Sequence, residues 1–326
     1  MHGQRGDGRR RGGAPPRARR APRARAHGVL ARPARRGAVG AVRGVSPGEI
    51  RALLDRHGLA ARKDLGQNFL ADERVAAKLA DLADVAPGDA VVEIGCGLGV
   101  LTRALAARAR RVVALEIDAG LVRAVRAEGL LPANAELRHA DALDVDLRAL
   151  LAEAPAPRRV VANLPYAVAS PLLRRLLDAA DLLAGWSVMV QREVAARLLA
   201  PPGARDYGSL AVLHQLAARV ERALDVHPRC FWPVPQVVST FVKLEARADA
   251  PGRAELARVE VVARAGFAHR RKTLANALRD AAGDASWLGA ALARMEALGV
   301  PPATRAETLA PETWRSLARA LAEDAA

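Results

Sequence analysis

Between residues 90 and 191, short apolar segments alternate with helical segments, and this alternation limits the possible folds more than any other feature of the chain. The apolar segments are rich in valine, leucine and isoleucine, and ten or more residues with helical periodicity separate them. Strands separated by helices pair in parallel, and a parallel sheet is covered on both faces. The sequence therefore predicts an α/β fold with parallel strands at residues 90–94, 112–116, 136–139, 159–162 and 187–191.

The segments on either side of this region have different patterns. Ser46 begins a capped amphipathic helix, a loop follows at residues 63–70, and a second helix is expected at 72–82. Two later β-rich stretches, 219–226 and 237–244, are joined by a segment too short for a helical crossover, so we expect them to be antiparallel. After Asp249 the pattern is wholly helical. We therefore predict an α/β domain at 46–248 and a helical domain at 249–326.

Residues 1–45 have a composition unlike the rest of the chain. They contain 13 arginines, one acid (Asp7) and almost no large apolar residue, which predicts a disordered Arg/Ala/Gly/Pro-rich extension. Three interpretations remain open: an RNA-binding arm, a targeting segment, or a start codon assigned too far upstream, and composition favours the third. The remainder holds 37 basic and 34 acidic residues. The whole chain has 46 arginines to 4 lysines beside abundant alanine, which is typical of a GC-rich genome, so total arginine content is weak support for nucleic-acid binding.

Composition also excludes several classes of protein. Cys96 and Cys230 lie far apart, which argues against a disulfide framework or a zinc site and favours a reducing compartment, the cytoplasm. Three histidines, at 139, 214 and 227, lack metal-ligand spacing, so we expect no metal. Charged residues interrupt every apolar stretch before it reaches about 18 residues, which excludes a membrane span.

The strand at 90–94 runs into a loop with glycines at 95, 97 and 99, and a helix begins at once. Glycines there allow a sharp turn and a close approach of the backbone to a ligand, so Gly95 and Gly97 are candidate cofactor contacts. Such a loop alone is a weak signal, because a structural turn is the alternative. Cys96 lies within it without a partner base, so packing is a better interpretation than nucleophilic catalysis.

Two acids follow the next strands. Glu116 ends the second strand about twenty residues beyond the glycines, where a carboxylate can accept both ribose hydroxyls of an adenosine-bearing ligand. The Gly-x-Gly-x-Gly spacing suits a nucleoside without a pyrophosphate better than NAD. Asp141, after the third strand, can accept from an adenine amino group, and a loop aspartate capping the next residues is an equal alternative.

The fourth strand ends in Asn163-Leu-Pro-Tyr166, the most informative tetrapeptide of the chain. The exocyclic amine of a nucleobase is a poor nucleophile because its lone pair is delocalised. The Asn163 oxygen and a backbone carbonyl next to Pro165 can accept both N–H bonds and direct that lone pair, and Pro165 fixes the turn. Tyr166 can stack on an extruded base. The alternative is a structural turn with a core tyrosine.

Two further features are candidates for RNA contact. Phe231 in the Pro-rich loop is expected either to cover the other face of the base or to lie in the core. Arg270, Arg271 and Lys272 form the compact basic cluster outside the extension, which we expect on a helix. A solvated helix face is the usual explanation of such clusters, but this one is a credible phosphate contact.

At these residues the chain closely resembles the ribosomal RNA adenine dimethyltransferase family, specifically the bacterial enzymes that act on the small subunit. The resemblance runs from about Ala61 to Leu309 and is specific, because many motifs occur in order. They are Lys63-Asp-Leu-Gly-Gln-Asn-Phe-Leu70, Glu93-Ile-Gly-Cys-Gly-Leu-Gly-Val-Leu-Thr102, Glu116, Asp141-Ala-Leu, Asn163-Leu-Pro-Tyr, Gln191-Arg-Glu-Val, Asp206-Tyr-Gly-Ser-Leu, Phe231 to Ser239, Arg270-Arg-Lys-Thr-Leu and Arg305-Ala-Glu-Thr-Leu. The departures are Cys96, Ala140 and Gln236, where the family often has Pro, Gly and Lys; the last weakens one expected phosphate contact.

The resemblance implies a Rossmann-like S-adenosylmethionine-dependent methyltransferase sheet with a smaller all-helical, RNA-binding C-terminal domain. It implies S-adenosylmethionine as cofactor, with contacts at Asn68, Leu70, Gly95, Glu116, Asp141 and Asn163.

It also implies dimethylation of two adjacent adenosines in the 3′-terminal hairpin loop of 16S rRNA by direct in-line displacement, and we expect a cytoplasmic monomer. The alternatives are a 23S rRNA adenine methyltransferase of the macrolide-resistance type and a non-catalytic RNA-binding assembly or transcription factor.

Overall fold

The computed structural model describes residues 46–283 and 286–323, which belong to one compact unit, Gly44–Ala326. The predicted extension at 1–45 lies outside the described residues. The main helices are α1 (Pro47–Arg56), α2 (Glu73–Leu82), α3 (Val100–Ala106), α4 (Ala119–Ala127), α5 (Leu147–Ala152), α6 (Ala169–Asp178), α7 (Arg192–Leu199), α8 (Ser209–Ala217), α9 (Arg253–Phe267), α10 (Leu274–Ala282), α11 (Trp287–Ala297) and α12 (Pro311–Glu323).

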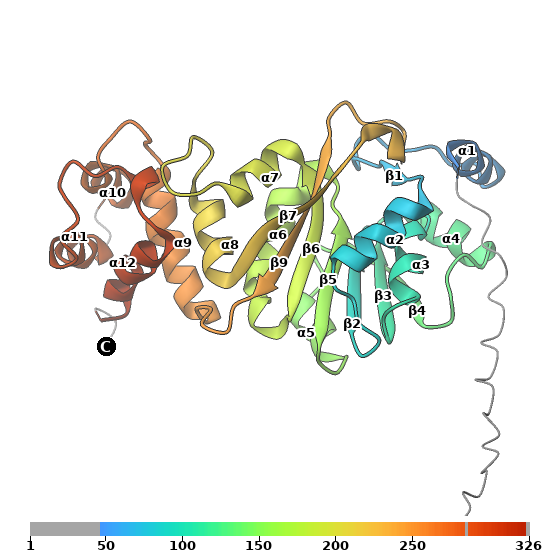
Figure 1. The fold of residues 1–326 in the computed structure, drawn as a ribbon, viewed down its shortest axis with the longest axis horizontal. Helices are drawn as coiled ribbons and strands as arrows, with labels where there is room; N and C mark the ends of the chain where they lie inside the picture. Colours follow the sequence, from blue (N-terminus) through green and yellow to red (C-terminus); the bar gives the residue numbers. More distant parts are fainter. Residues whose placement is uncertain (1–45, 284–285, 324–326) are drawn as a thin grey trace, which may run out of the picture. The chain divides into compact units, whose positions relative to one another are not determined.

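A seven-stranded sheet forms the centre of the described part of the chain, in the order β4-β3-β2-β5-β6-β9-β7 (Figure 1). Its strands are β2 (Ala90–Ile94), β3 (Arg111–Glu116), β4 (Ala135–His139), β5 (Arg158–Asn163), β6 (Gly185–Gln191), β7 (Ala218–Val226) and β9 (Ser239–Ala246). The first five are parallel, and β9 pairs antiparallel with both β6 and β7. The predicted parallel sheet and the predicted antiparallel pair are both confirmed.

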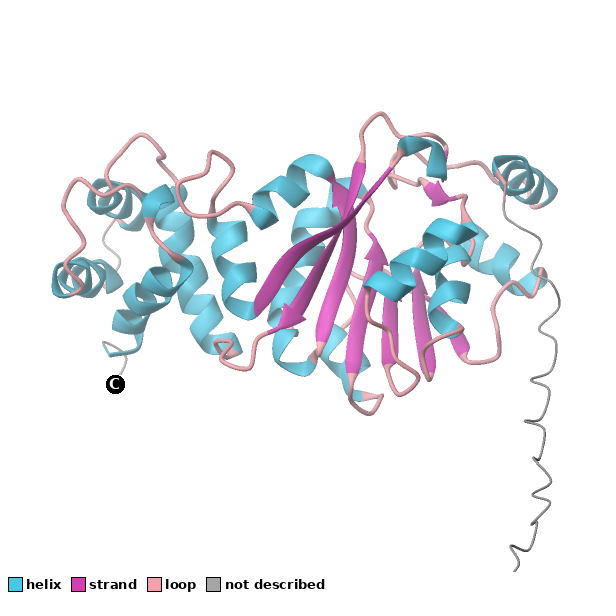
Figure 2. Ribbon diagram, in the orientation of Figure 1, coloured by secondary structure: helices cyan, strands magenta, loops and turns pink. Residues whose placement is uncertain are grey.

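Helices cover both faces of the sheet (Figure 2). Successive residues of one strand point to opposite faces of the sheet, where two hydrophobic core clusters lie. Val91 belongs to the cluster that includes α2 and α3, whereas Val92 belongs to the cluster that includes α5, α6 and α8. Val161 and Val160 divide between the two clusters in the same way. The sheet is therefore buried on both sides, as its continuous apolar strands require.

Short polar side chains begin several of the helices. Ser46 and Glu49 form a complete capping box at the start of α1, and Asp72 accepts from the backbone of Arg74 and Val75 at the start of α2. Asp118 caps α4 in the same manner. These caps satisfy N–H groups that the helices themselves leave unpaired. The two predicted N-terminal helices are thus confirmed, with α2 beginning one residue later than expected.

A second, two-stranded sheet joins distant segments and was not predicted. Strand β1 (Phe69–Leu70) pairs antiparallel with β8 (Phe231–Trp232). The rings of Phe69 and Trp232 stack with centroids 6.4 Å apart. The segment at 63–70, expected to be a loop, therefore ends in a strand that is fixed against the Pro-rich segment.

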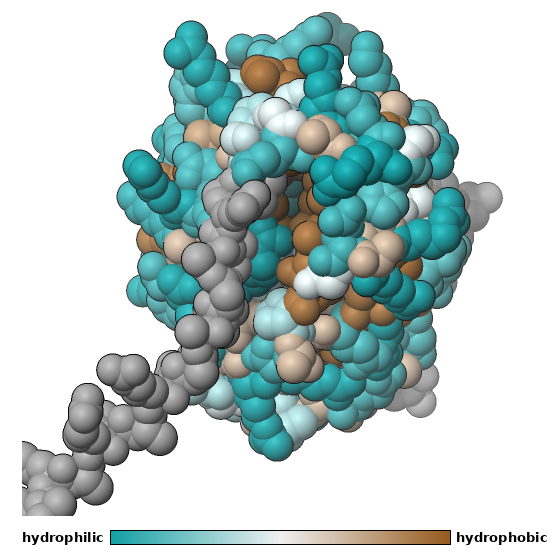
Figure 3. All heavy atoms as spheres, turned by 90° about the vertical axis from the view of Figure 1, so that its right-hand side faces the viewer, coloured by the Kyte–Doolittle hydropathy of each residue, from teal (hydrophilic) through white to brown (hydrophobic). Residues whose placement is uncertain are grey.

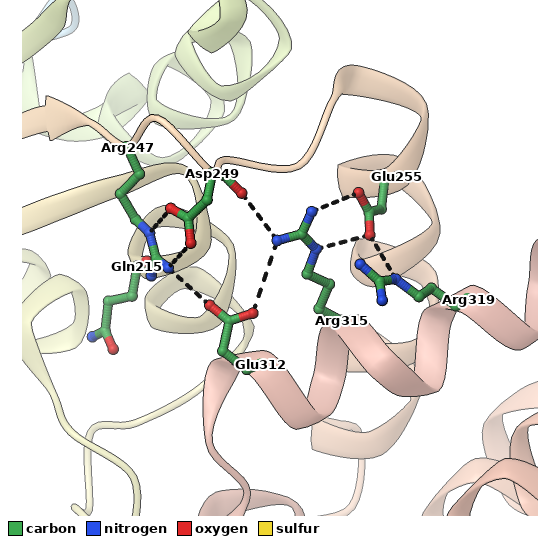
Figure 4. A network of polar contacts seen from close by, with 7 residues as sticks. All are labelled: Gln215, Arg247, Asp249, Glu255, Glu312, Arg315 and Arg319. Atoms are coloured by element: carbon green, nitrogen blue, oxygen red, sulfur yellow. Dashed lines mark hydrogen bonds and ion pairs between the residues drawn. The ribbon is translucent and has the colours of Figure 1, made fainter.

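The chain after β9 is helical, as predicted, and α9 and α12 pack on α8. Val259 and Trp314, both fully buried, belong to the same core cluster as the α8 residues. A polar network also holds this region: Arg315 donates to both carboxylate oxygens of Glu255, at 2.8 and 3.1 Å, and to the Asp249 carbonyl at 3.0 Å (Figure 4). Within the described residues, no helix is both long and apolar enough to cross a membrane.

Candidate functional site

A cavity lies at the carboxyl ends of the parallel strands, where the order of the strands reverses between β2 and β5. Ligands of open α/β sheets bind at such a switch point. The cavity measures about 740 Å³ with its open mouth, a size that suits a small-molecule ligand. Most of the predicted site residues line it: Asn68, Leu70, Gly95, Gly97, Glu116, Asn163, Pro165 and Tyr166.

A second cavity of about 580 Å³ adjoins the first and shares Gly95 and Pro165 with it. Its other lining residues are mainly apolar, together with Asp64 and Asp141. The Asp141 carboxylate accepts the Leu143 N–H at 2.7 Å, as the capping interpretation expects. Contact between Asp141 and adenine stays a prediction. Figure 3 shows that hydrophobic residues line a hollow on the side of the molecule that bears α1 and α4.

The glycine loop is shaped by close packing. Gly97 has a φ of +55°, and a Cβ added there would lie 2.9 Å from Cδ1 of Phe69. Only glycine fits this left-handed position beside the phenylalanine ring. Cys96 next to it is buried, and burial raises the pKa of its thiol, which supports packing as its role.

Glu116 holds the glycine loop in place from the end of β3. One carboxylate oxygen accepts the Gly97 N–H at 2.8 Å and the other accepts the Asp118 N–H at 2.9 Å. The side chain is buried, and burial raises the pKa of its carboxyl. Each carboxylate oxygen has a second lone pair and Glu116 lines the cavity, so the group can still accept hydroxyl donors.

Glu93 is a site residue to which the sequence analysis gave no role. It lies in β2, is 1% exposed and lines the first cavity, and burial raises the pKa of its carboxyl to about 8. Its Oε2 has no hydrogen-bond partner among the described residues. The sequence did contain a signal for this residue: an acid within the apolar run Val91-Val-Glu-Ile94. A carboxylate buried in such a strand requires a partner, which could have indicated a ligand.

Asn163 and Tyr166 are both fixed by contacts from other segments. Asn163 Nδ2 donates to the Asn68 carbonyl at 3.2 Å, which leaves Oδ1 without a partner among the described residues. Tyr166 is half-buried and lines the cavity, and its hydroxyl shares a hydrogen bond of 2.8 Å with Ser239 on β9. Asn163 and Tyr166 thus both line the cavity, and their contacts with a base stay a prediction.

Phe231 does not line either cavity. It is 1% exposed and belongs to the same buried core cluster as Leu70 and Phe241. Of the two interpretations of this residue, its burial supports the core position. The expected contact between Phe231 and a base has no support in this geometry.

The basic cluster lies elsewhere, in the turn between α9 and α10, and its predicted helical conformation is wrong. The Lys272 N–H donates to the His269 carbonyl, and α10 begins only at Leu274, whose N–H donates to Thr304. Lys272 forms an ion pair with Asp280, and Arg270 donates to two backbone carbonyls. Phosphate contact by Arg270, Arg271 and Lys272 stays a prediction.

The residues that line the two adjoining cavities suit S-adenosylmethionine as a ligand. The glycine loop lets the ligand approach the backbone closely, and Glu116 can accept ribose hydroxyls. The orphaned carboxylate oxygen of Glu93 suits a cationic ligand, because a positive charge beside it compensates its burial. The apolar second cavity can hold a planar base.

Comparison with known proteins also identifies methyltransferases as relatives of the chain. A model of the ribosomal RNA adenine dimethylase family matches residues 58–323. Ribosomal RNA small subunit methyltransferase A of Anaeromyxobacter sp. (strain K) is 46% identical over 279 residues, which cover 83% of this chain and 97% of the relative.

Two solved structures also resemble the chain. A dimethyladenosine transferase from Plasmodium falciparum has a TM-score of 0.65 and 26% identity, covering 77% of this chain and 96% of its own. The 23S rRNA methyltransferase ErmE has a TM-score of 0.57 and 29% identity, covering 78% and 100%.

Proposed function

Because the chain belongs to the ribosomal RNA adenine dimethylase family, we propose that it dimethylates two adjacent adenosines in the 3′-terminal hairpin loop of 16S rRNA during small-subunit assembly. The protein is an rRNA adenine dimethyltransferase, and S-adenosylmethionine is its methyl donor. The proposed target is supported by the 46% identity to an enzyme named for the small subunit. The observation that carries the proposed chemistry is that all four residues of Asn163-Leu-Pro-Tyr166 line the cavity.

In the proposed mechanism the chain's residues position the adenine amine for direct in-line displacement. The bound cofactor supplies an electrophilic methyl group on its sulfonium. Asn163 Oδ1 and the Leu164 carbonyl accept the two N–H bonds of the amine, which directs the nitrogen lone pair toward the cavity. Neither oxygen has a hydrogen-bond partner among the described residues.

The remaining site residues hold the reactants. Tyr166 stacks on the extruded base, and its bond to Ser239 keeps the ring in place. Glu116 binds the ribose of the cofactor, and Asp141 accepts from its adenine. No general base is required before the attack, because the amine is activated by orientation.

We also propose that the protein is a cytoplasmic monomer whose RNA substrate contacts both the α/β region, 46–248, and the helical region, 249–326. The basic turn with Arg270, Arg271 and Lys272 belongs to the helical region. Sedimentation of the free enzyme and of its complex with small subunits measures the stoichiometry directly.

Methyl transfer from tritiated cofactor tests the proposed target. We expect label in the 3′-terminal fragment of 16S rRNA when the substrate is small subunits that lack the modification, and none in 23S rRNA. Label in 23S rRNA alone would identify the macrolide-resistance type of activity. Binding to small subunits without transfer would identify a non-catalytic factor.

A further inference from the structure

The loop that joins α7 to α8, residues 200–208, is held against the helical region by backbone carbonyls. Tyr207 in this loop is fully buried, and its hydroxyl donates to the Leu309 carbonyl at 2.9 Å. The Gly203 N–H donates to the Glu307 carbonyl. This loop is therefore a fixed part of the surface.

Arg270 forms a third attachment, through its forked guanidinium. Nη1 donates to the Tyr207 carbonyl at 3.0 Å and Nη2 donates to the Arg205 carbonyl at 2.8 Å. A guanidinium holds two acceptors in a defined geometry, which a lysine cannot do. Arg270 thus brings the backbone of Arg205 next to the turn at residues 268–273.

Two neighbouring cations remain without partners among the described residues. Arg205 and Arg271 are both exposed, and the side chain of neither forms an ion pair or hydrogen bond within the described part of the chain, although Asp206 follows Arg205 directly. Lys272, in contrast, is paired with Asp280. Arg205 and Arg271 are therefore free to pair with a new anionic partner.

Both segments lie on the side of the sheet that carries the cavity. Helix α7 begins at the carboxyl end of β6. Helix α8 then runs back to the start of β7, at the opposite edge of the sheet. Strand β9 is antiparallel to β6, so α9 begins at the opposite edge and returns toward the cavity side. Figure 1 shows the α7–α8 and α9–α10 connections at the upper side of the view, the side toward which β5 and β6 run.

We propose that Arg205 and Arg271 form one phosphate-binding surface for the backbone of the rRNA substrate, and that Arg270 positions Arg205. This inference rests on the proposed rRNA substrate and assigns a second segment, the α7–α8 loop, to its recognition. Arginine suits the role because it pairs with phosphate oxygens in a forked arrangement. Arg270 is then a positioning residue behind the surface.

The test compares the salt dependence of binding to small subunits that lack the modification, using the full chain. Arg205→Gln and Arg271→Gln are each expected to reduce the slope of log K against log salt by about 0.7 to 0.9, and the double variant by about twice that. The matched control is Arg110→Gln. Arg110 is exposed, has no ion pair among the described residues, and precedes β3 at the opposite edge of the sheet. A slope for Arg205→Gln equal to that of Arg110→Gln would overturn the proposal.

A double-mutant cycle tests the positioning role. Arg270→Lys keeps the charge but loses the fork, so we expect weaker binding in the parental chain and no further loss when Arg205→Gln is already present. Fully additive losses would show that Arg270 acts without Arg205. Methyl transfer by the parental enzyme tests the proposed function separately. If the parental enzyme transfers methyl but the Arg205 variants bind normally, the phosphate-binding surface is wrong and the proposed function stands.

Discussion

Asn163 Nδ2 donates to the backbone carbonyl of Asn68 over 3.2 Å, and this bond joins segments 95 residues apart at the cavity. It fixes the orientation of the amide, so that the oxygen and not the nitrogen remains available to a substrate. The acceptor role proposed for Asn163 depends on this contact.

We expect Asn163→Ala to slow methyl transfer by more than any other single change in Asn163-Leu-Pro-Tyr166. The variant loses the acceptor for the adenine amine and a wall of the cofactor site, so cofactor affinity should fall as well. Single-turnover transfer and calorimetric binding measure the two effects. Asn134→Ala is the control, since the described partners of the Asn134 side-chain amide are the Ala106 and Ala109 carbonyls, and Asn134 does not line the cavity. Parental transfer by Asn163→Ala would contradict the mechanism.

Tyr166→Ala should act on the RNA side alone. The loss of a stacked base is expected to cost about 1 to 3 kcal/mol in transfer, while cofactor affinity stays within a few-fold. Tyr166→Phe is the matched control, because it keeps the ring and removes only the bond to Ser239. If Tyr166→Ala transfers methyl at the parental rate, the ring does not stack on the target base.

Glu116→Ala should weaken cofactor binding by about 1 to 3 kcal/mol, because the ribose loses a charged acceptor. The structure adds a second cause: the Gly97 N–H loses its partner, so the glycine loop is less well held. Glu116→Gln keeps one acceptor oxygen, so its affinity for the cofactor should lie between those of the parental enzyme and Glu116→Ala. Titration calorimetry gives the three constants, and equal values for all three would remove Glu116 from the cofactor site.

Glu93 should make the cofactor-free enzyme less stable at alkaline pH. Burial raises the pKa of its carboxyl to about 8, against 4.5 ordinarily. The folded state therefore retains a proton that the unfolded state releases, and this contribution is complete below pH 4.5 and lost as pH rises through 8. The free energy of unfolding should fall by at most about 1.4 kcal/mol per pH unit in that window.

The measurement is urea unfolding at several pH values between 5 and 9. Glu93→Gln, which cannot ionise, should show a smaller fall over this range than the parental chain. Because a cationic ligand favours the ionised carboxylate, the cofactor should also release a proton on binding at pH 7, which calorimetry in buffers of different ionisation enthalpy detects. Parallel curves for the two proteins would show that Glu93 does not titrate in this range.

Much of the site could be predicted because it follows from a parallel sheet. The carboxyl ends of parallel strands meet at one edge, so Gly95, Glu116 and Asn163 had to lie close together once the strands were assigned. The strand at Ala90–Ile94 was predicted to the residue. The ends of a strand can be predicted this accurately when a glycine or a charged residue bounds its apolar run.

The rest depends on contacts that leave no local pattern. Strands of two residues, such as β1 and β8, have no periodicity to detect, so the core position of Phe231 was only one of two alternatives. The turn at His269–Lys272 had a helix-like composition, yet Leu274 bonds to Thr304 and α10 begins there. Arg270 gave no sign of its bonds to a loop 63 to 65 residues earlier.

The position of β9 between β6 and β7 has a consequence for synthesis of the protein. Within the described sheet β7 pairs with β9 alone, yet β7 precedes β9 in the chain. As the polypeptide leaves the ribosome, residues 218–226 have no strand to join until residues 239–246 have followed. Strand β7 therefore cannot be paired in the sheet until β9 has been synthesised, and the arrival of β9 also brings Ser239 to Tyr166.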